Sequence, residues 1–329
     1  MQNKWTLTLI QNKRFLITGA TGFIGSHLVE YFSQHNNQIV CGVRKDTKNS
    51  SRLKHIENLE FVEYGLKEPC NHLRSQLLNI DYILHVAANP SSEASLQDPI
   101  GAIFDNVVGT GYILELAREL NLKRFVYYST AEVFGPVRLG NDSKEDDPYN
   151  SNNPYGATKA GGEELAVAYS SSFGIPTSVV HLNNSFGERC QSTRFPVTTI
   201  KKILNNEKLV IHTGADGHIG GRRWYYVKDV AEHTDFILQN QKSHCEKWNS
   251  AGAEFIDNLS FAKMIAQSLK KELRYDLVPV DRPGHDAYNL VNPDKLYREG
   301  YKNTSTTQEK IDNMVKWYLN NTQWLENVQ

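Results

Sequence analysis

The chain has 329 residues, of which 36 are lysine or arginine and 37 are aspartate or glutamate, so its formal net charge is -1 at pH 7. This balance leaves no overall field that would draw the chain onto nucleic acid or an anionic membrane. We therefore expect neither among its partners, and any anion that it binds has to be held by a local site.

The N-terminal segment MQNKWTLTLIQNK lacks the charged head and continuous apolar stretch of a signal peptide. No apolar run approaches the roughly 20 residues of a membrane span. We therefore expect a cytoplasmic protein. The four cysteines, Cys41, Cys70, Cys190 and Cys245, are far apart and show no Cys/His ligand spacing, which predicts free thiols and no metal site.

Short apolar runs alternate with helical patterns in the first half of the chain. The predicted strands read RFLITGA (14–20), QIVCGVR (38–44), LEFVEYG (59–65), DYILHVAA (81–88), RFVYYST (124–130) and PTSVVHLNN (176–184). Strands interleaved with helices predict βαβ units, and hence an α/β fold of the Rossmann type with a doubly wound parallel sheet. Such sheets bind ligands at the carboxyl ends of their strands.

The alternation weakens beyond Phe186, where loops predominate and helices are expected near 259–271 and 308–320. We interpret this part as a smaller C-terminal substrate lobe. The predicted organisation is a nucleotide-binding domain over 1–180 and a lobe over 181–329, with the possibility that the chain crosses back into the first domain.

Gly19, Gly22 and Gly25 form a G-x-x-G-x-x-G pattern between the first predicted strand and a helix. Glycines at this spacing allow a tight turn and let a pyrophosphate approach the free N–H groups at the start of the helix. The alternative is a strand-to-helix turn that is glycine-rich by chance. The βαβ series that follows favours dinucleotide binding.

The end of the second predicted strand bears on the choice of dinucleotide. An acidic side chain there accepts a hydrogen bond from the ribose 2′-hydroxyl, whereas a basic one accommodates a 2′-phosphate. The segment reads CGVRKDTKNSSR, with Arg44 and Lys45 ahead of Asp46. The basic pair favours NADP over NAD, although a solvated charge run is the alternative and Asp46 could still reach the ribose.

Tyr155 and Lys159 form a Y-x-x-x-K pattern at the start of a helical stretch, which places both side chains on one face, one turn apart. A lysine ammonium beside a phenol lowers the pKa of the phenol and makes it a usable base. Ser129 and Thr130 end a predicted strand and offer hydroxyls to an alcohol that loses its proton to the tyrosine. A solvated Tyr/Lys pair is the alternative interpretation.

Five segments together resemble the extended short-chain dehydrogenase/reductases that modify nucleotide sugars: ITGATGFIGSH, DYILHVAA, NVVGTGYILELARE, YYSTAEVFG and NPYGATKAGGEE. The resemblance implies a nucleotide-sugar substrate, with Thr130, Tyr155 and Lys159 as the catalytic trio. It also implies that Asn106 braces the active-site helix, that Asn184 contacts the substrate diphosphate and that Arg223 lies near the nucleotide. The cofactor would contact Gly19, Gly22, Phe23, Ile24, Gly25, Arg44, Ala87, Tyr155 and Lys159.

The same resemblance suggests a homodimer. Two stretches, NVVGTGYILELAREL and KAGGEELAVAYSSSF, have apolar residues at helical spacing. Packing on the sheet accounts for that spacing, and the resemblance adds a four-helix interface between two copies of the chain.

Within this family, DRPGHDAYNLVNPDKL and STAEVFG resemble segments of the dTDP-glucose 4,6-dehydratases. Glu132 matches their base, which removes the C5 proton once C4 is a ketone. Ala131, however, stands where those enzymes have the aspartic acid that assists the leaving hydroxyl, and Ala287 and Tyr288 replace an arginine usual in them.

The departure at Ala131 leaves several interpretations open. Another group or an ordered water supplies the acid, or the protein is a nucleotide-sugar 4-epimerase, which needs no acid at C6. A UDP-glucuronate decarboxylase-like enzyme and a dinucleotide-binding protein without turnover are further alternatives. Weaker candidates for phosphate contacts are Arg194, Arg222 and Arg282.

Overall fold

The computed structural model describes residues 9–45, 47, 49–214, 217–279 and 288–326. They divide into two compact units. The first comprises the chain up to Ser129 together with Thr158–Val180 and Lys228–Trp248, and the second comprises Thr130–Ala157, His181–Val227 and the chain from Asn249 onward.

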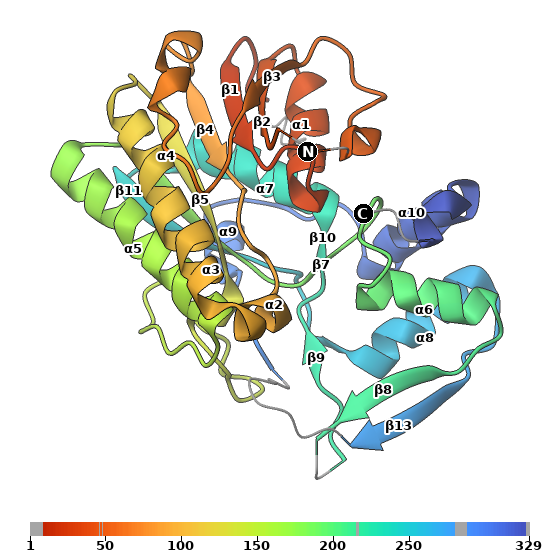
Figure 1. Ribbon diagram of the computed structural model, residues 1–329. Helices are drawn as coiled ribbons and strands as arrows, with labels where there is room; N and C mark the ends of the chain where they lie inside the picture. Colours follow the sequence, from red (N-terminus) through yellow and green to blue (C-terminus); the bar gives the residue numbers. More distant parts are fainter. Residues whose placement is uncertain (1–8, 46, 48, 215–216, 280–287, 327–329) are drawn as a thin grey trace, which may run out of the picture. The chain divides into compact units, whose positions relative to one another are not determined.

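Seven strands form one sheet (Figure 1). Each of the pairs β2–β3, β1–β2, β1–β4 and β4–β5 is parallel, which confirms the predicted α/β architecture. The six predicted strands are all present. From one edge to the other, the sheet contains β11 (Cys245–Ser250), β6 (Thr177–Leu182), β5 (Arg124–Thr130), β4 (Tyr82–His85), β1 (Arg14–Thr18), β2 (Gln38–Val43) and β3 (Glu60–Glu63).

Helices cover both faces of this sheet because successive side chains of a strand point to opposite sides. On β1, the ring of Phe15 stacks on Phe32 of α1 (Phe23–Ser33), with 4.5 Å between the ring centroids. The next residue, Leu16, belongs to the apolar core that contains Ile113 of α4 (Gly109–Arg118) and Ala166 of α5 (Pro154–Phe173). Thus the sheet is doubly wound, as predicted.

The chain returns to the first unit at α7 (Val227–Asn240), so the units are not separated by one boundary near residue 180. Two contacts hold α7 there. The Tyr31 hydroxyl of α1 donates to Asp235 over 3.1 Å, and the hydroxyls of Tyr128 and Thr234 lie 2.7 Å apart. The edge strand β11 follows α7. Its sequence, CEKWNS, has too many polar residues to be recognised as a strand from hydrophobicity alone.

The second unit contains α6 (Phe195–Leu204), α8 (Asn258–Leu269) and α10 (Thr307–Asn320). Helices α8 and α10 confirm the two predicted helices, and α10 begins with a capping box formed by Thr306 and Glu309. The strands of this unit form three two-stranded sheets. They are β7 (Ser185–Phe186) with β10 (Tyr225–Tyr226), β9 (Gly221–Arg222) with β12 (Ile256–Asp257), and β8 (Leu209–Thr213) with β13 (Tyr275–Pro279).

Short helical segments complete the description. They are η1 (Asn49–Arg52), η2 (Asn71–Gln76), α2 (Ser92–Gln97), α3 (Pro99–Ile103), the π-helical turn η3 (Phe104–Val108), η4 (Ala131–Val133), α9 (Asp294–Arg298) and η5 (Thr322–Leu325).

One helical stretch among the described residues, Pro99–Arg118, is long and apolar enough to cross a membrane by length and composition alone. It comprises α3, η3 and α4, and 44% of its apolar window is buried. Ile113 and Leu114 of α4 are buried in the apolar core that packs against the sheet.

Candidate active site

The glycine pattern forms a tight loop between β1 and α1. Gly19 has a left-handed backbone with φ of 66°, and the N–H of Gly22 donates to its carbonyl over 2.9 Å. A Cβ at Gly25 would collide with that same carbonyl, so the helix starts against the loop only because residue 25 is glycine.

Helix α1 begins at this loop without a side-chain cap. Its N-cap residue is Gly22, and its first turn carries no acidic residue. The N–H groups of the first turn therefore remain available to an anionic group. A Cβ at Gly19 would come within 2.9 Å of the Ala87 backbone nitrogen, so the glycine lets the loop after β1 and the segment after β4 approach each other closely. These features fit the pyrophosphate of a dinucleotide.

Buried hydrogen bonds between the ends of β1 and β4 hold the start of the glycine loop in place. Thr18 Oγ1 lies 2.9 Å from His85 Nδ1 and accepts from the N–H of Ala87 over 3.2 Å. Burial, together with the charge of Lys159, lowers the pKa of His85 to about 3, so this imidazole is neutral at pH 7. His85 thus supports the loop as a neutral hydrogen-bonding group.

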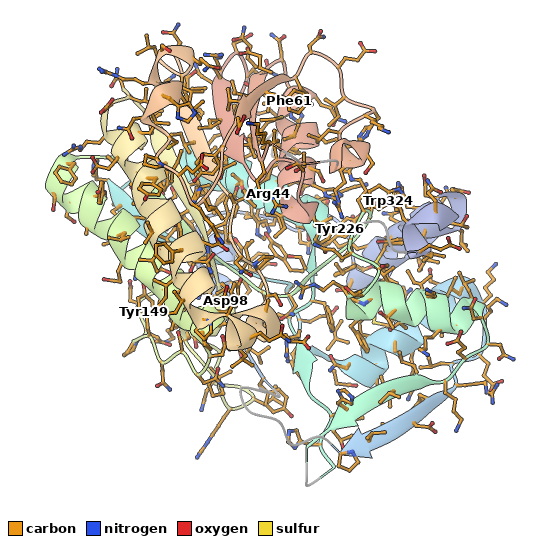
Figure 2. The ribbon with its side chains drawn as sticks, in the orientation of Figure 1. Arg44, Phe61, Asp98, Tyr149, Tyr226 and Trp324 are labelled. Atoms are coloured by element: carbon orange, nitrogen blue, oxygen red, sulfur yellow. The ribbon has the colours of Figure 1, made fainter. Side chains whose placement is uncertain are left out.

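Basic side chains follow β2. Arg44, labelled in Figure 2, and Lys45 are both exposed at the end of this strand. Arg52, which the sequence analysis does not single out, is buried and donates from its guanidinium to the carbonyl of Thr21 in the glycine loop over 3.3 Å. The sequence does not reveal this contact, because Arg52 is 31 residues away from Thr21 and reaches it only through the position of η1. Asp46 lies outside the described residues.

At the end of β5, side chains link the strand to the start of α5. Thr130 Oγ1 accepts from the N–H of Glu132 over 3.3 Å. Asn153 Nδ2 donates to the Glu132 carboxylate over 2.9 Å, and Asn153 Oδ1 accepts from the N–H of Gly156 over 2.9 Å. Asn153 therefore caps α5 and holds Glu132 at the same time. The Asn-Pro pair ahead of Tyr155 was the signal for this cap.

Tyr155, in the first turn of α5, is hydrogen-bonded to Thr130. Burial and the Glu132 carboxylate raise the pKa of Tyr155, while the bond to Thr130 and the charge of Arg194 lower it. Together these effects raise the pKa of Tyr155 above its ordinary value. The expected lowering of this pKa by a neighbouring lysine is therefore wrong, because burial of the phenol and the Glu132 carboxylate outweigh the hydrogen bond to Thr130 and the charge of Arg194.

Lys159 lies one turn further along α5 and is 3% exposed. Its Nζ lies over the ring of Tyr127, 4.2 Å from the centroid, and the Tyr127 hydroxyl donates to the Lys159 carbonyl over 3.0 Å. Burial lowers the pKa of Lys159 to about 7, and the charge of Glu163 opposes this effect. Lys159 thus titrates near neutral pH.

Asn106 connects α5 to the loop after β4. Its Nδ2 donates to Thr158 Oγ1 over 3.0 Å, and its Oδ1 accepts from the N–H of Asn89 over 2.8 Å. The residue belongs to the π-helical turn η3, and such turns often occur at functional sites. This arrangement fits the bracing role that the resemblance implies.

The two arginines before β10 have different partners. Arg222 Nε donates to the Asn184 side chain over 3.0 Å. Arg223 forms an ion pair with Asp142 and donates to the carbonyl of Ala253 over 2.6 Å. Of the two, Arg222 is therefore the one that joins the predicted diphosphate contact. Arg282 and Ala287 lie outside the described residues.

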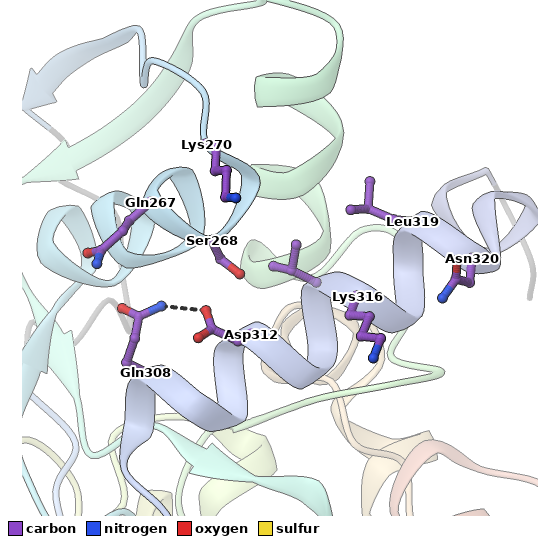
Figure 3. A pocket seen from close by; sticks show the side chains of 9 residues that line it. Gln267, Ser268, Lys270, Gln308, Asp312, Lys316, Leu319 and Asn320 are labelled. Carbon is purple, nitrogen blue, oxygen red and sulfur yellow. Dashed lines mark hydrogen bonds between the residues drawn. The ribbon is translucent and has the colours of Figure 1, made fainter.

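Two surface pockets occur in the second unit. One, of about 430 Å³, lies between α8 and α10, where Gln308 donates to Asp312 over 2.8 Å (Figure 3). The other, of about 480 Å³, includes Arg223 and Asp142. Neither contains Thr130, Tyr155 or Glu132, so neither is the reacting centre. Among the described residues no cluster of His, Cys, Asp or Glu could hold a metal ion.

A glycine loop for a dinucleotide, a Y-x-x-x-K helix and a carboxylate at the end of β5 define the class of protein. The sequence pattern of the NAD dependent epimerase/dehydratase family matches residues 15–251, and the chain belongs to this family of enzymes. This confirms the resemblance inferred from the motifs.

Two similar proteins are dTDP-glucose 4,6-dehydratases. A dTDP-glucose 4,6-dehydratase from Shigella flexneri is 30% identical over 348 residues, which cover 96% of this chain and 95% of the relative. The dTDP-glucose 4,6-dehydratase of Streptomyces venezuelae, solved with NAD and TYD bound, superimposes with a TM-score of 0.84 at 25% identity, covering 96% of this chain and all of that one.

An epimerase has a similar fold. The UDP-N-acetylglucosamine 4-epimerase from Methanobrevibacter ruminantium M1, solved with UDP-N-acetylmuramic acid, gives a TM-score of 0.85 at 23% identity and covers 95% of this chain. Fold similarity therefore does not separate dehydratases from epimerases.

Proposed function

We propose that the protein is a nucleotide-sugar 4,6-dehydratase that acts through transient oxidation of the sugar at C4. The observation that carries the proposal is Glu132, whose carboxylate is bound by Asn153 beside Thr130 and Tyr155. A 4-epimerase has no step that requires a carboxylate to remove the C5 proton. The dehydratases among the relatives support the same choice.

In this mechanism Tyr155 accepts the proton of the C4 hydroxyl, and Thr130 hydrogen-bonds the same oxygen. The glycine loop would hold a nicotinamide dinucleotide, which would supply the hydride acceptor for C4 and the hydride donor for C6. Because burial raises the pKa of Tyr155, positive charge has to act on the phenol for it to serve as a base. Lys159 and Arg194 are the cations of this chain that we assign to this task.

Glu132 then removes the C5 proton, which the neighbouring ketone acidifies. The C6 hydroxyl leaves as water and needs a proton, which Ala131 cannot supply. We propose that the protonated Glu132 passes this proton to the leaving hydroxyl, either directly or through a water molecule. One carboxylate would thus act first as the base and then as the acid.

The proposal is tested by incubating the enzyme with cofactor and dTDP-, UDP-, GDP- or CDP-hexoses in D₂O and following the sugar by NMR. A 4-keto-6-deoxy product with deuterium at C5 is expected, and Glu132→Gln should abolish it. Inversion at C4 without solvent deuterium would instead make the protein a 4-epimerase, the alternative that Ala131 favours. A lack of turnover that persists with every sugar would contradict both.

We further propose that NADP is preferred over NAD, although the Streptomyces venezuelae dehydratase was solved with NAD. The proposal rests on Arg44 and Lys45, two exposed cations at the strand end where a 2′-phosphate would lie. Calorimetric titration of the cofactor-free protein should give a lower Kd for NADP⁺, and Arg44→Ala should reduce the preference about tenfold. Equal affinity for both dinucleotides would overturn this assignment.

We also propose that the protein is a homodimer. Three neighbouring apolar side chains of α3 and η3 are exposed, namely Ile100 (62%), Ile103 (42%) and Phe104 (51%). A second copy of the chain would bury them. Sedimentation equilibrium should give twice the chain mass, and Phe104→Glu should shift the mass toward the monomer. A monomer in the unmodified protein would contradict the proposal.

A further inference from the structure

Helix α5 carries a buried carboxylate, Glu163, that has no part in the proposed mechanism. Glu163 is completely buried, and it is held from two strands of the sheet. Ser129 Oγ of β5 donates to Glu163 Oε2 over 2.7 Å, and Lys247 Nζ of β11 lies 3.2 Å from Oε1. A buried charge is costly unless it is paired, so this arrangement indicates a specific role for the carboxylate.

Glu163 follows Lys159 by four residues on α5, so the two side chains share one face of the helix. Tyr127 of β5 faces the Lys159 side chain with its aromatic ring. All of these residues belong to the first unit. The K-x-x-x-E spacing was the sequence signal for this pair.

The other groups near the pair do not supply negative charge. His85 of β4 faces Lys159 and is neutral at pH 7. Cys245 of β11 faces Glu163 and Lys247, and burial raises the pKa of its thiol, which keeps it protonated. Tyr127 faces the ammonium of Lys159 with its aromatic ring, and its hydroxyl donates to the Lys159 carbonyl. Among the described residues that act on the charge of Lys159, Glu163 is therefore the acid that favours the ammonium.

We propose that Glu163 is a positioning residue that keeps Lys159 protonated, and that Ser129 and Lys247 fix its carboxylate for this purpose. Lys247, the more exposed lysine with 22% of its side chain accessible, forms the ion pair with this carboxylate, whereas Lys159 feels its charge from one helical turn away. The catalytic meaning of this proposal rests on the proposed function, in which Lys159 acts on Tyr155. The electrostatic part does not depend on it.

The shared carboxylate predicts opposite effects for two substitutions. Glu163→Gln removes the negative charge and should make Lys159 lose its proton more readily. Lys247→Met removes the competing cation, so the carboxylate then acts on Lys159 without it, and Lys159 should keep its proton to higher pH. If Glu163 had a purely structural role, both substitutions would change the free energy of unfolding, but they would not shift the pKa of Lys159 in opposite directions.

The test is an NMR titration of cofactor-free protein labelled with ¹³C-lysine, in which the signal that Lys159→Arg removes is followed from pH 5 to 11. We expect Glu163→Gln to lower the midpoint of this signal by about 1 and Lys247→Met to raise it by about 0.5. Glu164→Gln, the exposed neighbour on the same helix, is the matched control and should leave the midpoint unchanged.

The proposal is overturned if Glu163→Gln leaves the midpoint unchanged, or if both variants shift it in the same direction. Should Glu163→Gln fail to fold, a midpoint unaltered in Lys247→Met overturns it equally. Because no substrate is present, the titration stands whether or not the protein is a dehydratase. In the active enzyme, the alkaline limb of kcat/KM should move to lower pH in Glu163→Gln, and a reduced kcat/KM with an unaltered limb would contradict the link to catalysis.

Discussion

The glycine loop after β1 and the junction between β5 and α5 both follow a strand end, yet they are built in different ways. In the loop the main chain provides the binding groups, and the absence of a Cβ at Gly25 lets α1 start against the Gly19 carbonyl. In the junction, side chains provide them, since Asn153 binds both Glu132 and the first turn of α5.

This difference determines how each site responds to substitution. A main-chain site depends on the space that its residues leave and fails when a side chain fills that space. A side-chain site depends on the identity of a few polar groups and can lose its chemistry while its fold persists.

Gly25→Ala should have the largest effect, because the added Cβ collides with a backbone carbonyl that has no room to move. We expect a loss of about 3 kcal/mol in the free energy of unfolding, together with loss of cofactor binding. Urea denaturation and calorimetric titration measure the two. Gly111→Ala on α4 is the control, since no atom beyond its chain neighbours and its own helix backbone lies within 4 Å of the added Cβ, and it should stabilise the helix by up to about 1 kcal/mol. Normal cofactor affinity in Gly25→Ala would refute the main-chain explanation.

Asn153→Ala tests the side-chain site. It removes the hydrogen bond to Glu132 and the cap of α5, so kcat should fall about 10- to 100-fold and the free energy of unfolding by about 1 kcal/mol. Asn153→Ser restores a capping oxygen without reaching Glu132 as the amide does, and should recover stability but not kcat. If serine restores both, the amide does not position Glu132. Steady-state kinetics of both variants with an accepted sugar nucleotide distinguish these results.

The pH dependence of stability distinguishes the two regions further, since residues 19–25 carry no titratable side chain. Lys159 has a folded-state pKa of about 7, below the value of about 10.4 in an unfolded chain. Between these values the unfolded chain binds more protons, so stability rises with pH by at most about 1.4 kcal/mol per pH unit. Lys159→Met should remove this rise. Urea denaturation at pH 7, 8 and 9 measures it, and an unchanged slope would show that Lys159 does not titrate there.

A smaller effect is expected within the second unit, from the pair of neighbouring arginines. Arg222→Ala removes the donor to Asn184 and should raise KM for the sugar nucleotide about three- to tenfold. Arg223→Ala breaks the ion pair with Asp142 and should act on stability instead. Measuring KM and the unfolding midpoint of both variants tests the assignment. The reverse pattern would return the phosphate contact to Arg223.

Most of the first unit could be predicted from its sequence. Six of the seven strands contain an apolar run, which in the edge strand β3 (EFVE) is only two residues long, and the glycine spacing marks the loop between β1 and α1. The exception is β11, whose polar residues Glu246 and Lys247 hide the strand. Lys247 occupies that position because the buried Glu163 carboxylate binds it, a contact between residues 84 positions apart.

The candidate site was predictable to the extent that its residues recur at fixed local spacing. Tyr155 and Lys159 share a helix face because an α-helix repeats every 3.6 residues, and Thr130 and Glu132 stand on either side of one residue. By contrast, the pKa of Tyr155 could not be predicted, since its direction depends on how deeply the fold buries the phenol.

The sequence by itself determined the α/β fold, the glycine loop, the Y-x-x-x-K helix and the family, because each follows from residues close together in the chain or from an ordered set of such motifs. Only the tertiary structure decided that Asn153 holds Glu132, that Arg222 rather than Arg223 reaches Asn184, that α7 returns to the first unit and that Glu163 lies between Ser129 and Lys247. These contacts join residues from separate elements, and their partners depend on burial and direction, which local spacing does not encode.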